Sequence, residues 1–249
     1  MSLPTPLEIE RAGLKCWPGI EVEWDRSWVR RAAGGHTKRA NSTQCFDPAD
    51  DQDVAQRVAA ARRWHEARGI QPTFRVNLLS GPSLIAELDR QGWAEIDRSL
   101  QMTTALEERE PDPQGELLAA DDPAFFDVQV ALKQWDDVTL DRFKAIVAVY
   151  DIPACGVVLR GDDGRAVSTS LMAVSGGIVI TGNVITDAAE RGKGYARRMM
   201  QTGLCWAYRQ GARIAALNVA ADNPAGQALY RSLGYEPQYD YVYRTPRPQ

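Results

Sequence analysis

The sequence predicts an α+β fold in which helices flank a mixed central sheet. Two observations lead to this prediction. Segments with the alternating pattern of strands take turns, in both halves of the chain, with segments whose apolar residues recur at helical spacing. The 249 residues are 44% hydrophobic and 25% charged, the composition of an ordinary globular protein with room for one large or two modest domains.

A polar stretch divides the chain. Residues 107–115 combine clustered charges with two prolines and a glycine, so this stretch cannot bury an apolar face. We therefore expect a linker between an N-terminal α/β domain, residues 1–110, and a second domain, residues 111–249.

The first half alternates short strands with helices. Residues 20–32 alternate apolar and polar side chains around Asp25-Arg26, which predicts a hairpin. The remaining predicted elements are a strand at 41–46, a helix at 53–68, a strand at 73–78, a helix at 83–91 that Gly92 ends, and a strand at 95–106.

The second half begins with helices and continues with strands. Turn residues at 162–164 and 175–177 separate three β segments as hairpins. The predicted elements are helices at 123–135 and 140–149, strands at 155–160, 165–174 and 178–186, a helix at 194–209, a strand at 214–219, a helix at 224–233 and a strand at 238–244.

The turn before the 194–209 helix carries the clearest functional signal. An apolar strand leads through a polar turn into Arg191-Gly192-Lys193-Gly194-Tyr195-Ala196, where the helix begins. Unpaired N–H groups and partial positive charge at a helix N-terminus attract phosphate. Glycines let the main chain adopt unusual torsions and approach a ligand closely. The pattern therefore predicts a phosphate-binding turn.

The Arg-x-x-Gly-x-Ala pattern of residues 191–196 resembles the coenzyme A signature of the GNAT acetyltransferase superfamily. Residues 217–223 resemble the fifth strand of that family and the residue that follows it. Within residues 223–235, Asn223, Tyr230 and Gly234-Tyr235 resemble the Asn, the Tyr and the Gly followed by an aromatic residue that the family has there. The resemblance covers about residues 117–245. It implies a GNAT acyl-CoA N-acyltransferase fold.

The resemblance also implies acetyl-CoA as co-substrate and no metal. The turn would hold the pyrophosphate, the 183–186 strand edge would pair with the pantetheine arm, and a backbone N–H of Val184 or Ile185 would hold the oxyanion. Surface charges beside a turn are the alternative interpretation of Arg191 and Lys193. The implied cofactor-binding residues are Val184, Ile185, Thr186, Arg191, Gly192, Lys193, Gly194, Tyr195, Ala196, Asn223 and Tyr230.

The implied catalytic residues are Tyr230 and Asn183. Tyr230 matches the usual general acid of the family, which would protonate the departing thiolate, although its helical spacing also fits a core contact. Strand 178–186 has no carboxylate, so we expect Thr181 and Asn183 to hold a water that removes the proton. Asp187 and Glu190 are expected to be solvated or capping groups.

The acceptor pocket of the family lies beside the connection between its first two helices. Here that connection carries Trp135 and Asp136, and an indole with a carboxylate suits a cationic amine. Solvent-exposed capping is the alternative role for these residues. Thr181 is the third expected acceptor contact.

The first half resembles a degenerate second copy. Leu88-x-x-x-Gly92-Trp93 corresponds to the pattern of residues 229–235, but no phosphate pattern precedes the helix at 53–68. A tandem of GNAT-like domains explains this, and chance similarity between two α+β layers is the alternative.

Composition excludes several classes of partner and site. A net charge of −4 argues against nucleic-acid binding, and no apolar run is long enough to span a membrane. The cysteines lie far apart in the sequence and there are two histidines, which argues against a disulfide framework, a zinc site or a histidine triad: Cys16, Cys45, Cys155, Cys205, His36 and His65. We expect a cytoplasmic protein.

A basic cluster in the first half fits either a solvated sheet face or an anion site. Its members are Arg26, Arg30, Arg31, Lys38 and Arg39.

The leading hypothesis is an acetyl-CoA-dependent N-acetyltransferase that acts directly on a small amine or amino-acid-like acceptor. The alternatives are a non-catalytic acyl-CoA-binding or interaction module and an enzyme that acetylates a protein or peptide. The oligomeric state, with a homodimer among the options, is left open.

Overall fold

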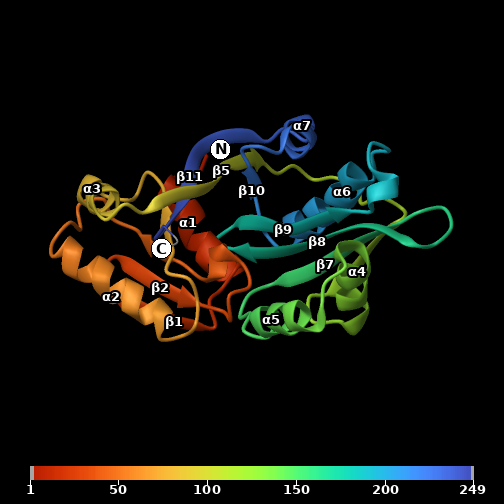
Figure 1. The fold of residues 1–249 in the computed structure, drawn as a ribbon. Coiled ribbons are helices and arrows are strands. Elements are labelled where there is room, and N and C mark those ends of the chain that lie inside the picture. Colours follow the sequence, from red (N-terminus) through yellow and green to blue (C-terminus); the bar gives the residue numbers. More distant parts are fainter. Residues whose placement is uncertain (1–2, 248–249) are drawn as a thin grey trace.

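The computed structural model describes residues 3–247, and Figure 1 shows its helices packed around a strongly twisted sheet. The strands of the described residues form one sheet in the order β1-β2-β3-β4-β11-β5-β10-β9-β8-β7-β6. Their bounds are β1 Glu21–Asp25, β2 Trp28–Ala32, β3 Thr43–Cys45, β4 Phe74–Val76, β5 Ala94–Ala105, β6 Gly115–Ala119, β7 Ala154–Arg160, β8 Ala166–Ser175, β9 Ile178–Thr186, β10 Ile214–Ala220 and β11 Glu236–Thr245.

The helices cover both faces of this sheet. Short 3₁₀ turns also lie at Lys38–Ala40 and Ala188–Glu190. The α-helices are α1 Pro6–Cys16, α2 Val54–Glu66, α3 Pro82–Arg90, α4 Pro123–Lys133, α5 Asp137–Val147, α6 Tyr195–Arg209 and α7 Pro224–Ser232. The α+β prediction is confirmed, and the predicted elements are present with ends shifted by a few residues.

Helix α1 and strand β6 are absent from the sequence prediction. Yet α1 begins with a recognisable signal, because Thr5 and Glu8 form a reciprocal capping box and Pro6 occupies the first helical position. Strand β6 starts at Gly115, inside the stretch interpreted as a linker.

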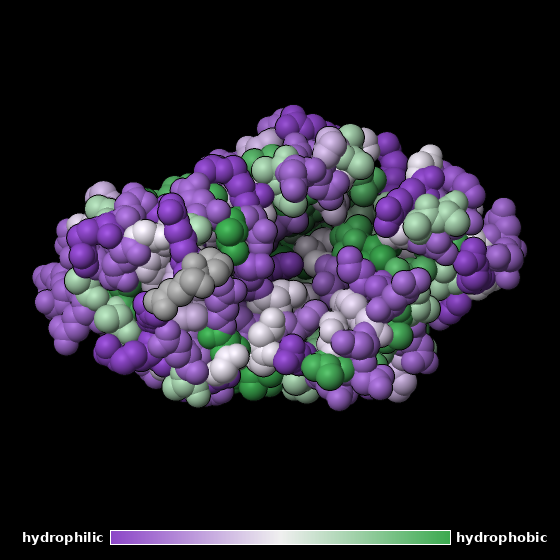
Figure 2. Space-filling model, viewed as in Figure 1, coloured by the Kyte–Doolittle hydropathy of each residue, from purple (hydrophilic) through white to green (hydrophobic). Residues whose placement is uncertain are grey.

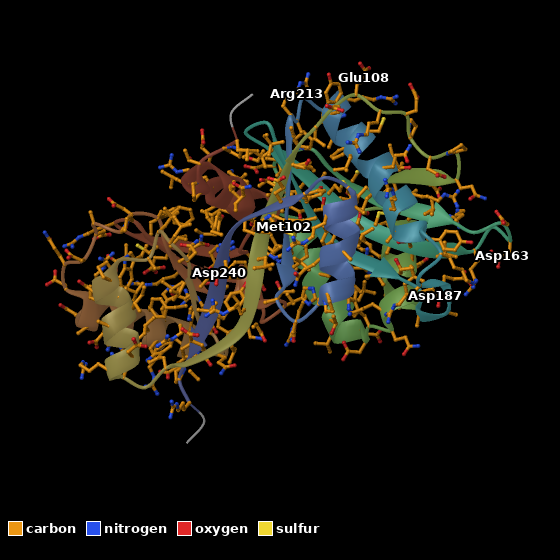
Figure 3. The ribbon with its side chains drawn as sticks, turned by 90° about the horizontal axis from the view of Figure 1, so that it is seen from above. Met102, Glu108, Asp163, Asp187, Arg213 and Asp240 are labelled. Atoms are coloured by element: carbon orange, nitrogen blue, oxygen red, sulfur yellow. The ribbon has the colours of Figure 1, made fainter. Side chains whose placement is uncertain are left out.

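The two halves exchange their last strands. Strand β5 pairs with β10 and β11, and β11 pairs with β4 and β5. Seen from above in Figure 3, Met102 of β5 lies between the halves, and Asp240 of β11 lies toward the N-terminal half. The sheet therefore runs continuously across the boundary near residue 110, and independent folding of residues 1–110 and 111–249 stays a prediction.

The packing of the faces fixes which side each site residue occupies. Helix α6 packs its buried face on β7 and β8, where Met199 and Leu204 meet Val157 and Met172. Helices α4 and α5 cover the opposite face of this region around Phe143. Gly156 of β7 lies directly under a phenyl ring of α4, and a β-carbon there would approach that ring to 2.3 Å. This glycine lets the helix approach the sheet closely.

The stretch between the halves, which was expected to be a linker, is docked on α6. Arg198 donates two hydrogen bonds to the Asp112 carboxylate, at 2.8 and 2.9 Å. The N–H of Asp112 donates to Thr202 Oγ1 at 3.1 Å, and Gln201 donates to the carbonyl of Glu110 at 2.8 Å. Paired charges hold a segment that has no apolar face of its own.

Within residues 3–247, no helix combines the length and the apolar character that crossing a bilayer requires. In the same range no three His, Cys, Asp or Glu side chains are grouped as metal ligands would be. All four cysteines are unpaired and buried, and burial raises the pKa of Cys16 to about 12.

Candidate functional site

The site begins where two parallel strands separate. Strands β9 and β10 pair in register from Ile178 with Ile214 to Thr181 with Leu217. Beyond these pairs β9 continues along β8 alone and β10 along β5 alone. We call the opening between the separated ends the cleft, and Figure 2 shows the surface hollowed near the middle of the molecule.

A β-bulge lies in β9 at the mouth of this cleft. The register between β8 and β9 shifts between Thr169, opposite Ile185, and Leu171, opposite Gly182. Asn183 sits in the bulge with a φ of 49°, a left-handed conformation that is strained for a residue with a side chain. A bulge releases backbone groups from the ladder and redirects them. The predicted pantetheine edge, residues 183–186, therefore lies where backbone groups face the cleft.

The turn after β9 leaves its N–H groups free. Gly192 and Gly194 have φ values of 78° and 83°, and Gly194 is the N-cap of α6 without a side-chain cap. In the described structure, the backbone N–H groups of residues 192–197 donate to no other protein atom. A β-carbon at either glycine would meet nothing within 4 Å, so the space above the turn is open. These properties fit a bound phosphate.

Charged side chains beside the turn are already paired. Lys193 Nζ contacts Glu190 at 2.9 Å, and this hydrogen bond raises the pKa of the ammonium. Asp187 caps the short 3₁₀ turn by accepting from the N–H of Ala189, as expected. The Glu190 side chain is 17% exposed and also lies 3.6 Å from Arg165. Arg191 remains exposed at the surface.

Helix α7 lies over the end of β10 and carries two of the predicted residues. Asn223 is its N-cap, and its side-chain oxygen accepts from the N–H of Gly226 at 2.9 Å. The side chain of Tyr230 is 8% exposed and packs in the core cluster that includes Leu217 and Val219 of β10. Burial raises the pKa of the Tyr230 phenol to about 12, so the phenol is protonated at neutral pH.

Two buried polar atoms of β9 lack partners in the described structure. These are Thr181 Oγ1 and Asn183 Nδ2. Buried polar groups are seldom left unsatisfied, so each can take a water or a substrate atom. Tyr235 is 1% exposed and packs in the core, as predicted.

The two helix-connection residues predicted to bind the acceptor lie in different surroundings. Trp135 packs against Phe143, with ring centroids 5.1 Å apart, and against His36 of the first half at 5.5 Å. Asp136 is the N-cap of α5, where its carboxylate accepts from the N–H of Thr139 at 2.8 Å. Trp135 thus lies where the two halves meet, while Asp136 is exposed at a helix end. Acceptor binding by Asp136 stays a prediction.

Three residues of the first half that sequence reasoning did not place at the site lie beside it. A β-carbon on Gly182 would lie 3.3 Å from the Trp17 ring and 3.5 Å from Arg39 Nη1. The Trp17 and His36 rings are 6.5 Å apart. The signal in the sequence was the basic cluster, but its contact with β9 follows from the strand exchange and was not visible.

A family model described as "Probable histone acetyltransferase Rv0428c C-terminal" matches residues 7–244. The chain belongs to this family. It is a GNAT N-acetyltransferase. This GNAT protein is 25% identical over 252 residues to an uncharacterized N-acetyltransferase, YobR, of Bacillus subtilis, covering 96% of this chain and 98% of the relative.

Solved structures share the fold over the whole GNAT chain. A GCN5-related N-acetyltransferase from Kribbella flavida superposes with a TM-score of 0.73 at 17% identity, covering 100% of this chain and 98% of the other. A tandem GNAT protein from the clavulanic acid biosynthesis pathway gives 0.64 at 14% identity, covering 100% and 90%. The prediction of a GNAT fold is confirmed, and a tandem with a degenerate first half stays a prediction.

Proposed function

We propose that this enzyme transfers the acetyl group of acetyl-CoA directly to the amine of a small or amino-acid-like acceptor. The observation that carries the proposal is the row of free N–H groups at residues 192–197, which opens beside the separated ends of β9 and β10. A diphosphate on this row would direct the attached pantetheine arm along the bulged edge of β9.

The donor supplies an activated thioester whose carbonyl a neutral amine can attack, with the thiolate as leaving group. Each residue then has a proposed role. The backbone N–H of Val184 or Ile185 holds the oxyanion, because the bulge at Asn183 frees groups of this segment from the ladder. A water on Thr181 Oγ1 and Asn183 Nδ2 accepts the proton from the amine. Tyr230 donates its phenolic proton to the departing thiolate.

A pKa of about 12 has two consequences for Tyr230 as a proton donor: the phenol stays protonated, but it is a weaker acid. The phenol holds its proton throughout the assay range, so the acid form is always present. A weaker acid transfers its proton less readily, and we therefore assign Tyr230 to the late collapse of the tetrahedral adduct, when the thiolate charge is largest.

Acetylation of a protein is the second candidate, since the matching family is described as a probable histone acetyltransferase. Its acceptor would be a lysine side chain or a chain terminus that enters the same cleft. Assays with small amines and with a lysine-rich peptide separate the two.

The test combines donor binding with turnover. Acetyl-CoA should bind by isothermal titration, and pools of amines, amino acids and aminoglycosides should release free thiol. Tyr230→Phe should lower turnover by about 10- to 10³-fold with nearly unchanged donor affinity, as typical acid–base contributions predict. Tyr208→Phe, at the C-terminal end of α6 and far along the helix from the phosphate turn, is the matched control and should leave turnover unchanged. Absence of acetyl-CoA binding at millimolar concentration would reject the proposal.

A further inference from the structure

We infer that Arg39 binds a carboxylate of the acceptor, so that the physiological acceptor is an amine that also carries an acidic group. This inference rests on the proposed function and specifies its substrate class. It concerns the first half of the chain, which lacks a phosphate turn of its own.

Arg39 reaches the transfer site from the other half of the molecule. It lies in the 3₁₀ turn Lys38–Ala40, which a Lys38–Asp97 ion pair of 2.8 Å fastens to β5. Its Nη1 lies 3.5 Å from the position that a β-carbon of Gly182 would take. Gly182 directly precedes the bulge residue Asn183. The absence of a side chain at Gly182 leaves room for the guanidinium beside the cleft.

The guanidinium lies on the face from which an acceptor would arrive. Along β9, Val179 packs in the cluster of α6, whereas Ile180 packs under α1 on the opposite face. Gly182 continues the alternation of Ile180 and faces Trp17 and Arg39. The phosphate turn begins α6, on the other side of the sheet. A thioester passing between the separated strands from the α6 side would meet an acceptor held on the Arg39 side.

The hydrogen-bonding capacity of Arg39 is incompletely used. In the described structure no carboxylate lies within ion-pair distance of it, and its Nη1 is buried without a partner. The guanidinium stacks on the Trp17 ring at 4.6 Å, and the indole is itself fixed by a 2.9 Å hydrogen bond to Thr37. A half-buried guanidinium that is oriented by stacking and keeps a free donor matches the geometry of a carboxylate.

The surrounding charges favour an anion. Arg31 is buried, donates to the carbonyl of Trp17, and has no carboxylate partner in the described residues. Burial, followed by the positive charges of Arg75 and Arg39, lowers the pKa of Arg31 to about 10. The charge of buried Glu10 acts on Arg31, but Arg75 and Gln44 already occupy its carboxylate. This excess of positive charge disfavours a lysine-rich peptide as acceptor.

The spacing suits a carboxylate close to the reacting amine. Gly182 and Val184 are two residues apart, a span of about 6.5 Å along an extended strand and less across a bulge. An amine and a carboxylate that a few bonds separate, as in an amino acid, bridge such a distance.

The test compares acceptors that differ only in charge. Amino acids and their carboxamides share the amine, so the ratio of their kcat/KM values isolates the carboxylate. We expect wild-type enzyme to prefer the acids at least tenfold, and Arg39→Gln to reduce this ratio by about 10- to 100-fold, as for loss of a charged hydrogen bond. Arg39→Gln should leave acetyl-CoA affinity unchanged, because Arg39 lies on the face of the sheet opposite the phosphate turn. Arg26→Gln, an exposed member of the same basic cluster, is the control and should keep the preference.

A second measurement is independent of turnover. N-acetyl amino acids, the expected products, are titrated calorimetrically into wild-type and Arg39→Gln enzyme saturated with coenzyme A. Binding to wild type that the variant loses supports the inference. Three results would overturn it while leaving the acetyltransferase assignment intact: equal use of acids and carboxamides, a preference that survives Arg39→Gln, or no binding of N-acetyl amino acids to wild type. Failure of acetyl-CoA itself to bind would instead contradict the proposed function.

Discussion

The two halves of this GNAT protein repeat the same order of elements but differ in the charges at the turn before the helix, α2 or α6. Strands β3 and β9 each lead through a turn into a helix, α2 or α6, and then into a parallel neighbour, β4 or β10. Both helices have an N-cap in the left-handed conformation, Asp53 with a φ of 55° and Gly194 with a φ of 83°. The backbone of the turn is thus conserved between the halves, whereas its chemistry is not.

The first half fills its turn with its own carboxylates. Asp50 accepts hydrogen bonds from Arg57 of α2 and from Ser27, so an anion already occupies the helix entrance. Arg57 and Arg198 are each the fourth residue of their helix, and each holds an aspartate. The comparison teaches that an external anion site can be replaced by an internal ion pair without loss of the fold.

The proposed general acid, Tyr230, has no counterpart in the first half. The N–H of Trp93 donates to the carbonyl of Leu88 at 2.9 Å, and the N–H of Tyr235 donates to that of Tyr230 at 3.0 Å. Leu88 therefore stands where the second half has Tyr230, inside a helix end of the same geometry. Leu88 is fully buried and can only pack.

The largest effect is expected when a carboxylate is placed in the turn before α6, as in the turn before α2. Gly194→Asp places a carboxylate at the phosphate site in a conformation that favours glycine, and should weaken acetyl-CoA binding by about 10²-fold or more. Isothermal titration measures the affinity. The converse change, Asp53→Gly, should leave affinity unchanged and create no second donor site. Two acetyl-CoA sites per chain in Asp53→Gly would contradict the proposed difference between the two turns.

The ion pairs of the two helices should differ in their contribution to stability. Arg57 is 7% exposed in its side chain and holds both Asp25 and Asp50, so Arg57→Ala should lower the free energy of unfolding by about 3 kcal/mol. Arg198 is 36% exposed, and Arg198→Ala should lower it by about 1 kcal/mol. Urea unfolding at pH 7 compares them, and equal losses would contradict the difference in burial.

The Arg57 contribution should also depend on pH. Burial acts to raise the pKa of Asp50, but hydrogen bonds from Arg57 and Ser27 outweigh it and lower the pKa to about 2. This contribution is full above the ordinary aspartate pKa of about 3.9 and is lost as the pH falls through about 2. The gap between wild type and Arg57→Ala should therefore narrow between pH 4 and pH 2. A gap that widens there would show that Asp50 is not the partner.

A modest effect is expected from the charges beside the phosphate turn. Glu190→Gln frees the Lys193 ammonium from its 2.9 Å ion pair, and should raise acetyl-CoA affinity about two- to threefold at low salt. The gain should vanish at high ionic strength. Loss of affinity in this variant would mean that Glu190 orders the turn rather than competing for Lys193.

The smallest expected effect is the alkaline pH dependence of Tyr230. Its pKa, raised by burial to about 12, lies above the range in which the enzyme can be assayed. The kcat profile should therefore show no falling limb from this phenol up to about pH 10. A falling limb near pH 9 that Tyr230→Phe removes would contradict the assignment of that pKa.

The sequence predicted local structure well and long-range pairing poorly. The glycines of the phosphate turn and the cap at Asn223 are local signals, and their elements lie where expected. The exchange of β5 and β11 was not foreseen, because strand neighbours depend on contacts between segments far apart in the sequence. The position of Arg39 beside Gly182 likewise depends on a contact between segments far apart in the sequence. The bulge at Asn183 was also not predicted, although Gly182 directly precedes it.

The exchange of β5 and β11 also determines when the sheet can be completed during synthesis of the chain. Strand β4 is complete at Val76, whereas its partner β11 begins at Glu236, about 160 residues later. At roughly 5 to 20 residues per second the ribosome needs on the order of 10 to 30 s to supply that partner. During this interval the growing chain exposes an unsatisfied strand edge to its neighbours. The protein therefore depends on prompt chain completion or on chaperone protection before its first half can mature.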